Sequence, residues 1–379
     1  MRLAFNATAL LSPLTGIGQY SFHLGSELLR LQAIEIEFFY GAYWENKLRN
    51  APPSVISASL PWFRRHIPYS YELRRWIQHS QFLHGTKRRK FDLDHEPNIL
   101  ALDFDGPTVI TVHDLSWIRH PETHPLERVK AMNRYFESGM RRADALITDS
   151  VFVKQELIDV FGVPEERISS IPLGVEAIFK PLDPIHTDEI LNLYHLVHGR
   201  YFLAVGTLEP RKNLSLVLEA YIQLPATIRD KYPLVLIGMK GWKTTQLEQQ
   251  IAPLICSGQV RQLGYLSRSD LAVLMAGATT LIYPSIYEGF GLPPLESMAC
   301  ATPVICANAS SLPEVVGDVG VLFHPQDDEA LIHAMIRIIE DKTWRDSLAL
   351  RSRERAASFT WLRCAQETLR VYQSVVSEN

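Results

Sequence analysis

Short apolar runs alternate with amphipathic segments along the whole 379-residue chain. The runs have the length and the Val, Ile, Leu and Phe content of buried strands, and the segments between them repeat apolar residues at helical spacing. Near-continuous apolar strands separated by helices are typical of parallel sheets that are covered on both faces. The pattern therefore predicts an α/β protein of the doubly wound, Rossmann-like kind.

The predicted elements fall into two blocks. In the first block we expect strands at 2–7, 35–41, 108–114, 145–150 and 168–174, and helices at 18–32, 126–142 and 151–161. In the second block we expect strands at 201–207, 233–239, 260–265, 280–285, 303–308 and 320–325, and helices at 213–223, 244–255, 293–300 and 327–340. Residues 176–200 contain two prolines and no clear periodicity in their first part, so they are expected to form a linker. The sequence thus predicts two domains, 1–180 and 181–359, that face each other across a cleft.

The amino-acid composition argues against several classes of protein, namely nucleic-acid-binding, membrane-spanning, secreted and disulfide- or zinc-stabilised ones. Hydrophobic residues make up 46% of the chain and charged residues 21%, which is typical of a globular protein. The net charge of −4 gives no reason to expect a nucleic-acid partner. No run reaches the roughly 18–20 apolar residues of a membrane span, and the first residues have no features of a secretory leader. The four cysteines form no Cys-x-x-Cys pair, so we expect neither a disulfide framework nor structural zinc, but a cytoplasmic protein.

Ligands of open α/β sheets bind beyond the carboxyl ends of the strands, so glycines and polar residues that follow strands are candidate site residues. In the first block these are Gly16 and Gly18, at the start of a helix, and the pair His113-Asp114. The glycines allow close approach of an anion to the helix amides, but the third position of a G-x-G-x-x-G pattern is Ser21, so a structural turn is equally consistent. His113 is a candidate catalytic group, the alternative being a histidine that only satisfies its own hydrogen bonds.

A third motif, GTLEPRKN at 206–213, follows the first strand of the second block. Asn213 is expected to cap the next helix. Arg211 and Lys212 directly precede it, where the helix dipole disfavours cations. A bound diphosphate would offset that cost through charge-assisted hydrogen bonds, whereas the alternative is a solvated basic turn.

The fourth motif, EGFGLPPLE at 288–296, follows the predicted strand 280–285. Its glycines allow a tight loop, and its prolines fit the first turn of a helix. The amides of Phe290, Gly291 and Leu292 are candidates for binding a phosphate. Glu288 and Glu296 flank this loop, and an ionised carboxylate can accept the paired hydroxyl donors of a sugar.

Residues 200–340 resemble the nucleotide-binding half of the retaining glycosyltransferases that carry a Glu-x7-Glu motif. The resemblance rests on GTLEPRKN, YPSIYEGFGLPPLESMACATPVICAN and SSLPEVVGDVGVLFHP, and less strongly on GIGQY, TVHDL and ITDS in the first half. It implies the two-domain GT-B architecture, with an acceptor domain at 1–180, a donor domain at 181–359, and a last helix at 360–375 that packs back on the first domain.

The same resemblance implies roles for the donor-domain residues. Glu296 would bind the ribose hydroxyls, and Glu288 would hold the transferred sugar as a catalytic residue. Arg211 and Lys212 would neutralise the diphosphate together with the amides of 290–292. Many relatives have Arg at the position of Thr207, a departure that leaves the phosphate charge mainly to these two cations.

In the acceptor domain, the resemblance implies that His113 contacts the donor sugar and that Gly16 and Gly18 pack against the diphosphate. It further implies transfer of a hexose, with mannose from GDP-mannose first, onto a polysaccharide or lipid-linked saccharide, without a cofactor or metal. A UDP-sugar donor is the alternative. A non-catalytic sugar- or nucleotide-binding partner is less favoured, because the charged motif residues are all present. Nothing in the sequence favours an epimerase or a phosphorylase of similar fold, and a pyridoxal-dependent phosphorylase normally needs a much longer chain.

Residues 60–90 are strongly basic. They contain eight Lys or Arg against the single acid Glu72, interleaved with aromatic residues such as Trp62 and Trp76. A solvated surface is one interpretation. The other is a peripheral contact with the anionic inner face of the cytoplasmic membrane, through cations and interfacial aromatic side chains.

Overall fold

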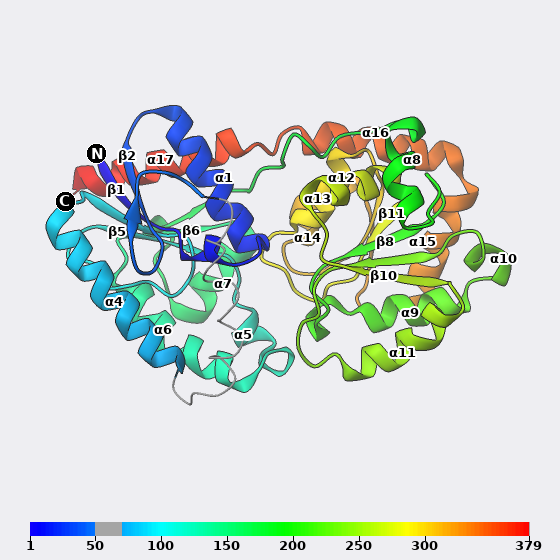
Figure 1. Ribbon diagram of the computed structural model, residues 1–379, viewed down its shortest axis with the longest axis horizontal. Coiled ribbons are helices and arrows are strands. Elements are labelled where there is room, and N and C mark those ends of the chain that lie inside the picture. The colour runs from blue at the N-terminus through cyan, green and yellow to red at the C-terminus, as the bar shows by residue number, and fades with distance from the viewer. Residues whose placement is uncertain (50–69, 379) are drawn as a thin grey trace. The chain divides into compact units, whose positions relative to one another are not determined.

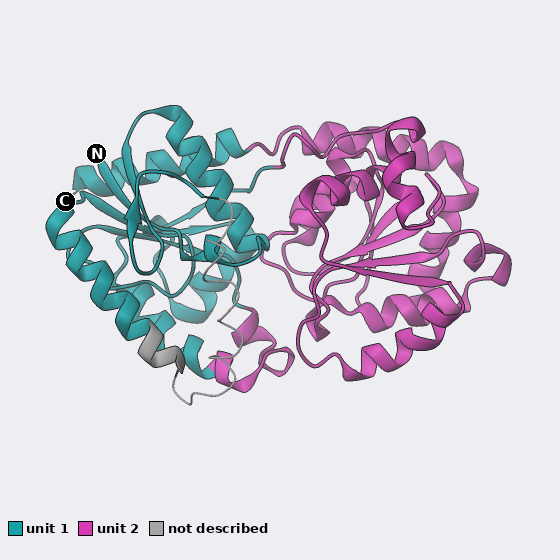
Figure 2. Ribbon diagram, viewed as in Figure 1, with its two compact units in different colours: residues 1–115, 130–174, 361–379 teal, residues 116–129, 175–360 magenta. Residues whose placement is uncertain are grey.

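The computed structural model describes residues 1–49 and 70–378. The chain forms two compact units (Figures 1 and 2). Unit 1 comprises residues 1–115, 130–174 and 361–379, and unit 2 comprises residues 116–129 and 175–360. Each unit is a doubly wound α/β structure, as predicted. The assignment of acceptor and donor to 1–180 and 181–359 stays a prediction.

Unit 1 is built on a seven-stranded sheet in the order β3-β2-β1-β4-β5-β6-β7. Its strands are β1 (Arg2–Asn6), β2 (Glu35–Phe39), β3 (Trp44–Glu45), β4 (Leu93–Glu96), β5 (Thr108–Val112), β6 (Ala145–Thr148) and β7 (Ile168–Ser170). All neighbours are parallel except β3, which is antiparallel to β2. The five predicted strands are all present, and each ends earlier than predicted because its last residues already belong to the following loop.

The helices of unit 1 cover both faces of this sheet. They are α1 (Gly16–Leu31), α4 (Ser70–Arg89), α6 (Leu126–Arg142), α7 (Val151–Phe161) and α17 (Trp361–Glu378), of which α6 begins in unit 2. In Figure 1, α1 and α17 lie together on one side of the sheet, and α4 and α6 lie on the other. The bounds of α7 follow from its caps, since Ser150 accepts a hydrogen bond from the Val153 amide and Gly162 ends the helix at a φ of 62°.

Strand β4 was not predicted, because its sequence LDHE has one apolar letter although all four residues are buried. A chain of hydrogen bonds compensates for the polarity. The ring of His95 bonds the hydroxyl of Tyr372 at 2.6 Å and that of Thr111 at 2.9 Å, and Thr111 bonds the Tyr20 hydroxyl at 2.8 Å. Burial lowers the pKa of His95 to about 3, so the ring is neutral. This network joins α17 and α1 to the centre of the sheet.

Unit 2 has a six-stranded parallel sheet in the order β10-β9-β8-β11-β12-β13. Its strands are β8 (Phe202–Val205), β9 (Leu234–Ile237), β10 (Val260–Gly264), β11 (Thr280–Tyr283), β12 (Val304–Ala307) and β13 (Val321–Phe323). All six were predicted. The side chains of the four central strands β9, β8, β11 and β12 are almost all buried, which accounts for the continuous apolar runs in the sequence.

The helices of unit 2 include four predicted ones, α9 (Leu214–Gln223), α11 (Thr245–Cys256), α13 (Leu292–Ala299) and α15 (Asp328–Glu340). The others are α5 (Ser116–Arg119), α8 (Pro184–Leu193), α10 (Ala226–Arg229), α12 (Arg268–Gly277), α14 (Leu312–Val316) and α16 (Lys342–Ala356). The prediction that 176–200 is a linker was wrong in its middle. Pro184 begins α8 instead of breaking a helix, because the first helical position needs no N–H and suits the fixed φ of proline.

Candidate active site

The candidate site of unit 2 lies where its strand order reverses. β8 and β11 are neighbours in the sheet, but the chain leaves them in opposite directions. The loops that follow these strands therefore diverge at a shared edge, which is where open α/β sheets bind ligands. These loops are the third and fourth sequence motifs, 206–213 and 288–296, and the structure brings them together.

The loop after β8 is held close to the loop after β9 by glycines. A Cβ atom on Gly238 would lie 1.9 Å from the carbonyl oxygen of Gly206, so only glycine permits this backbone contact. A Cβ atom on Gly241, in the loop after β9, would likewise lie only 2.9 Å from the Thr207 side chain. Asn213 precedes α9 in a left-handed conformation, but its side chain donates to the Pro325 carbonyl at 2.9 Å. The prediction that this side chain caps the helix was therefore wrong.

Glu288 is the centre of a buried polar cluster. Its Oε2 accepts from Arg211 Nη1 at 3.0 Å, and its Oε1 accepts from Lys212 Nζ, from the Ser285 hydroxyl at 2.6 Å and from the Tyr283 hydroxyl at 3.0 Å. Only about a tenth of the Glu288, Arg211 and Lys212 side chains is exposed. Three residues that the sequence assigned to donor binding or catalysis are thus in direct contact.

The charges of this cluster balance without a ligand. Arg211 also donates through Nη2 to Glu209 Oε1 at 2.8 Å, so two cations face two carboxylates. The sequence suggested that the cations destabilise a site without a bound diphosphate, but Glu288 and Glu209 supply the compensating charge. Burial opposes the ionised form of Glu288, yet Arg211 and Lys212 together lower the pKa of Glu288 to about 2.

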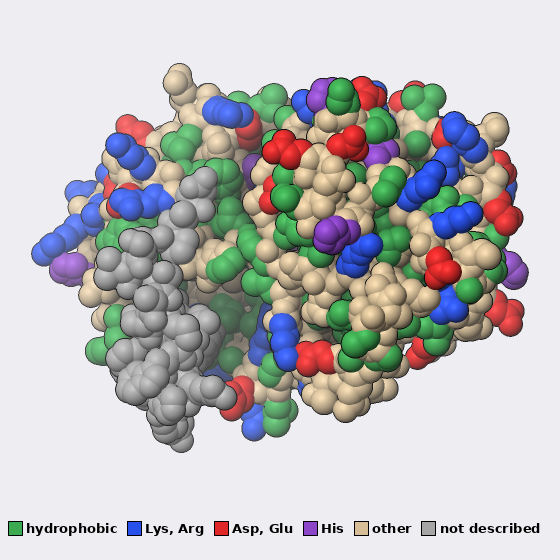
Figure 3. Space-filling view, turned by 45° about the vertical axis from the view of Figure 1, so that its right-hand side comes forward, with side chains coloured by type: hydrophobic (Ala, Val, Ile, Leu, Met, Phe, Trp, Pro, Cys, Tyr) green, Lys and Arg blue, Asp and Glu red, His purple; other side chains and the backbone are tan. Residues whose placement is uncertain are grey.

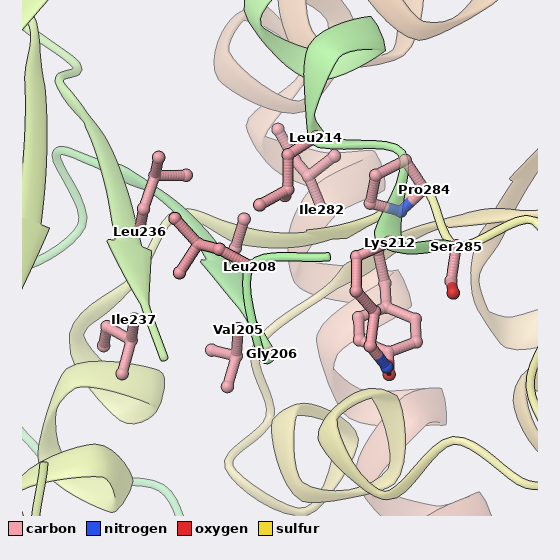
Figure 4. A pocket seen from close by; sticks show the side chains of 12 residues that line it. Val205, Gly206, Leu208, Lys212, Leu214, Leu236, Ile237, Ile282, Pro284 and Ser285 are labelled. Atoms are coloured by element: carbon pink, nitrogen blue, oxygen red, sulfur yellow. Dashed lines mark hydrogen bonds between the residues drawn. The ribbon is translucent and has the colours of Figure 1, made fainter. Parts of the chain in front are cut away.

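Lys212 borders a small hollow at the ends of β8, β9 and β11 (Figure 4). In Figure 4 the side chains of Lys212 and Ser285 lie on one side of it, and Leu208, Leu236 and Ile237 lie on the other. Its volume is about 10 Å³, enough for one water molecule. The hollow is therefore too small to hold a nucleotide.

The loop from Glu288 to α13 is fixed by two serines. The Glu288 amide donates to the Ser310 hydroxyl at 2.8 Å, and the Ser311 hydroxyl lies 2.9 Å from the carbonyl oxygens of both Glu288 and Phe290. Gly291 stands before the helix with a φ of 119°, a conformation that favours glycine. Because two prolines follow, Leu292 carries the single N–H among the first three helical residues. The role of amides 290–292 in phosphate binding stays a prediction.

Glu296 lies in α13 and is nearly fully buried, with 5% of its side chain exposed. Its Oε1 accepts from Arg268 Nη2 at 2.5 Å, and Arg268 Nε donates to Glu176 Oε1 at 2.8 Å. Sequence reasoning missed Arg268 and Glu176. Arg268 follows β10 closely, so the search for polar residues after strands could have included it. Glu176 gave no such signal.

His113 directly follows β5 in unit 1, and both of its ring nitrogens are engaged there. Nδ1 lies 2.7 Å from Asp149 Oδ2, and Nε2 lies 2.9 Å from the Pro97 carbonyl oxygen. The ring also packs edge-on against Tyr20 at 4.8 Å between ring centres. Burial opposes protonation, but Asp149 and the two hydrogen bonds outweigh it and raise the pKa of His113. The hydrogen bonds fit the alternative interpretation of a satisfied histidine, and a contact with the donor sugar stays a prediction.

The two glycines of the first motif differ in what the fold requires of them. A Cβ atom on Gly18 would lie 3.0 Å from Leu14 Cδ2, so packing within unit 1 favours glycine there. A Cβ atom on Gly16 would meet no atom of the described residues within 4 Å. Packing therefore gives no reason for Gly16, and its proposed contact with a diphosphate stays a prediction.

The described residues hold neither a cluster of metal-ligand side chains nor a helix that could span a membrane. Residues 1–49 and 70–378 contain no group of three or more His, Cys, Asp or Glu side chains placed to hold a metal ion. Within the same ranges, every helix is too short or too polar for a membrane crossing. Independence from metals and cofactors stays a prediction.

Both halves of the chain match families of known enzymes. Residues 196–357 match the family described as Glycosyl transferases group 1, and residues 14–177 match Glycosyltransferase Family 4. The chain is 35% identical to the O-antigen chain mannosyltransferase B of Escherichia coli, over 98% of this chain and 100% of that protein. It is 32% identical to the O-antigen chain mannosyltransferase RfbU of Salmonella typhimurium, over 86% and 87% of the two chains.

Solved structures with low identity share the fold. Sucrose-phosphate synthase from Thermosynechococcus elongatus superposes with a TM-score of 0.80 at 20% identity, over the whole of both chains. HepE of Anabaena, solved in complex with UDP and glucose, gives a TM-score of 0.73 at 19% identity, over 99% of this chain and 100% of that one. These likenesses establish the GT-B fold that the sequence predicted.

Proposed function

We propose that this chain, which belongs to the group 1 glycosyltransferases, transfers mannose from GDP-mannose to a saccharide of a bacterial surface polysaccharide, with retention of the anomeric configuration. Glycosyl transfer itself follows from the family. The names of the relatives support mannose as the sugar. The observation that carries the mechanism is the contact of Glu288 with Arg211 and Lys212 at the reversal of the sheet.

In this reaction the bond between the anomeric carbon and the β-phosphate oxygen of GDP-mannose breaks. A new bond forms between that carbon and an acceptor hydroxyl oxygen, whose proton passes to the departing phosphate. The negative charge of the leaving GDP increases in the transition state, and two preorganised cations in a buried site stabilise such charge strongly. Arg211 and Lys212 supply them.

Glu288 has two successive roles in this proposal. Without a donor, it balances Arg211 and Lys212. A diphosphate provides new acceptors for both cations, which leaves Glu288 able to accept hydrogen bonds from the hydroxyls of the sugar. Because the pKa of Glu288 is about 2, it remains a carboxylate throughout. This exchange of partners connects binding of the phosphates with positioning of the mannose.

A UDP-sugar is the second candidate donor, and one observation favours it: HepE, which shares the fold, was solved in complex with UDP-glucose. In this proposal the charged cluster contacts the phosphates and the sugar, so it does not distinguish guanine from uracil. The alternative of a non-catalytic binding partner is disfavoured by the presence and close contact of Glu288, Arg211 and Lys212.

A thermal-shift panel of GDP, UDP, ADP and their sugar conjugates tests the donor. A ligand at 100 times its dissociation constant should stabilise the fold by about 2.7 kcal/mol. We expect GDP and GDP-mannose to raise the melting temperature, and UDP and ADP to leave it nearly unchanged at equal concentration. Stabilisation by UDP compounds alone would establish the alternative donor, and no shift with any nucleotide would contradict the enzyme assignment.

We also propose a peripheral contact with the inner face of the cytoplasmic membrane through α4. Trp76 is 65% exposed and Ile77 44% exposed, and Lys87, Arg88 and Lys90 are exposed near the other end of the helix. Over the right-hand part of the face in Figure 3, by contrast, acidic and basic side chains are interspersed. Cations and an interfacial aromatic residue on one helix suit an anionic lipid surface.

Some of the eight predicted cations serve the fold instead. Arg75 donates to the Ala101 carbonyl at 2.8 Å and stacks on Tyr135, and Arg89 pairs with Glu37. These two cations are therefore engaged within unit 1, and the proposed membrane contact rests on the others. The side chains of Arg64, Arg65 and Arg74 lie outside the described residues.

Liposome co-sedimentation tests this contact. Binding should require anionic lipid, weaken as salt rises, and largely disappear when Lys87, Arg88 and Lys90 are changed to Ser, because each cation near such a surface contributes about 1 kcal/mol. The matched control changes the exposed Lys231, Lys240 and Lys342 of unit 2 to Ser, removing the same charge elsewhere. Equal loss in both triple variants, or no binding by the wild type at low salt, would refute a contact through α4.

A further inference from the structure

We propose that Arg268 is a positioning residue for the donor nucleotide, which fixes the orientation of the Glu296 carboxylate and is itself held by Glu176. This rests on the proposed function and on the role that the family resemblance implies for Glu296, acceptance of hydrogen bonds from the ribose hydroxyls. None of the four sequence motifs includes Arg268 or Glu176. Arg268 contacts Glu296, 28 residues away in sequence, and Glu176, 92 residues away.

One guanidinium contacts both carboxylates. Arg268 Nη2 donates to Glu296 Oε1 at 2.5 Å and also to Glu176 Oε1, and Nε donates to Glu176 Oε1 at 2.8 Å. Its guanidinium carbon lies 4.6 Å from the centre of the Phe179 ring, close enough for a cation–π contact. Arg268 is thus restrained by Glu176 and by Phe179. Both residues follow closely after position 175, where the chain passes from unit 1 into unit 2.

The position of Arg268 is unfavourable by itself. It is the first residue of α12, after the capping Ser267, where the helix dipole disfavours a cation. Burial also disfavours the charged guanidinium. The carboxylates of Glu296 and Glu176 nevertheless raise the pKa of Arg268, so the side chain stays protonated. The group of three side chains carries a net charge of −1, so no charge surplus draws Arg268 away from Glu296 towards a phosphate.

The arrangement restricts what Glu296 can do. A carboxylate that accepts a charge-assisted hydrogen bond through Oε1 is restricted in its rotation about the last C–C bond. Its hydrogen-bonding directions are then set before the nucleotide arrives, and binding need not pay for ordering it. Without Arg268, the Glu296 carboxylate would lose this charge-assisted hydrogen bond and rotate more freely, so ribose binding would weaken while the diphosphate contacts persisted.

Titration calorimetry with GDP, its 2′,3′-dideoxy analogue and inorganic pyrophosphate tests the inference. Arg268→Gln should weaken GDP about tenfold, the effect of losing a hydrogen bond to a charged group. Pyrophosphate, which has no ribose, should bind the wild type and the variant alike. The variant should also lose most of the wild-type preference for GDP over the dideoxy analogue, and Arg268→Lys should recover part of it by restoring the charge.

Kinetics separate positioning from a purely structural role. In Arg268→Gln, the KM for the donor should rise about tenfold with kcat changed by less than about threefold. The matched control is Arg355→Gln, which removes a partly buried guanidinium that donates to the Val315 and Glu314 carbonyls at 2.7 Å. It should lower the melting temperature but leave the preference for ribose hydroxyls intact.

The outcomes distinguish the two levels of the proposal. If the wild type and Glu296→Gln both bind GDP and the dideoxy analogue equally, the ribose role of Glu296 is wrong. If Glu296→Gln abolishes the preference but Arg268→Gln retains it in full, Glu296 binds ribose and the inference about Arg268 is overturned. A double variant that is no weaker than either single variant would support one shared contact with the ribose.

Discussion

Glu288→Gln is expected to lower turnover by about a hundredfold or more, the scale seen when one preorganised electrostatic group is removed from an active site. The same change should leave GDP affinity unchanged or tighter. Glutamine cannot balance Arg211 and Lys212, so both cations become more available to a diphosphate. Both oxygens of Glu288 accept hydrogen bonds, but the NH₂ group of a glutamine can only donate. It would therefore face a hydrogen-bond donor of the cluster, and this repulsion would displace the side chain that faces the sugar.

Steady-state kinetics with GDP-mannose and calorimetry with GDP measure the two effects separately. Glu209→Gln is the matched control, because the Glu209 carboxylate pairs with Arg211, whereas the ammonium group of Lys212 pairs with Glu288. It should alter turnover much less than Glu288→Gln. Glu296→Gln should show the opposite pattern, with weaker GDP binding and a smaller loss of kcat. A reversed result for Glu288 and Glu296 would show that their assignments must be exchanged.

The ionisation of Glu288 adds a further expectation for the same experiment. Arg211 and Lys212 keep the folded-state pKa of Glu288 near 2, so it is charged at any pH at which the enzyme can be assayed. An acid limb in the pH profile of kcat/KM must then arise from another group. The ion pairs of Glu288 stabilise the fold above the unfolded-state pKa of about 4.3. That contribution decreases as the pH falls towards 2.

The sequence predicted that the third and fourth motifs of unit 2 lie together, because both follow strands of one parallel sheet. The four central strands of that sheet, β9, β8, β11 and β12, were recognisable from buried aliphatic residues, and parallel strands place their carboxyl ends at one edge. Arg211, Lys212 and Glu288 could therefore be expected near each other. The local pattern could not show which carboxylate each cation would contact, nor that Glu209 takes part.

Features that depend on long-range contacts escaped prediction. The polar letters of β4 are stabilised by Thr111 and Tyr372, which are distant in sequence, so no local pattern marks it as a strand. Asn213 is of a residue type that often caps helices. Its side chain instead donates a hydrogen bond to the carbonyl of Pro325, which is 112 residues away in sequence. Glu176 likewise could not be predicted, because its role depends on the contact with Arg268, which is 92 residues away in sequence.

Arg211→Ala and Lys212→Ala are each expected to weaken GDP binding by about 10- to 150-fold, because each removes a charge-assisted contact worth about 1.5–3 kcal/mol. Guanosine has no phosphate, so it should bind the wild type and both variants equally.

Substitution also leaves the buried Glu288 with one cation fewer, and a buried carboxylate without compensation destabilises a fold. The melting temperature of each variant must therefore be measured with the affinities. Equal weakening of guanosine and GDP would mean that the substitutions damage the fold of unit 2, and unchanged GDP affinity would mean that these cations serve Glu288 alone. Selective loss of GDP binding would show that the same cations that balance Glu288 without a ligand bind the diphosphate when the donor is present.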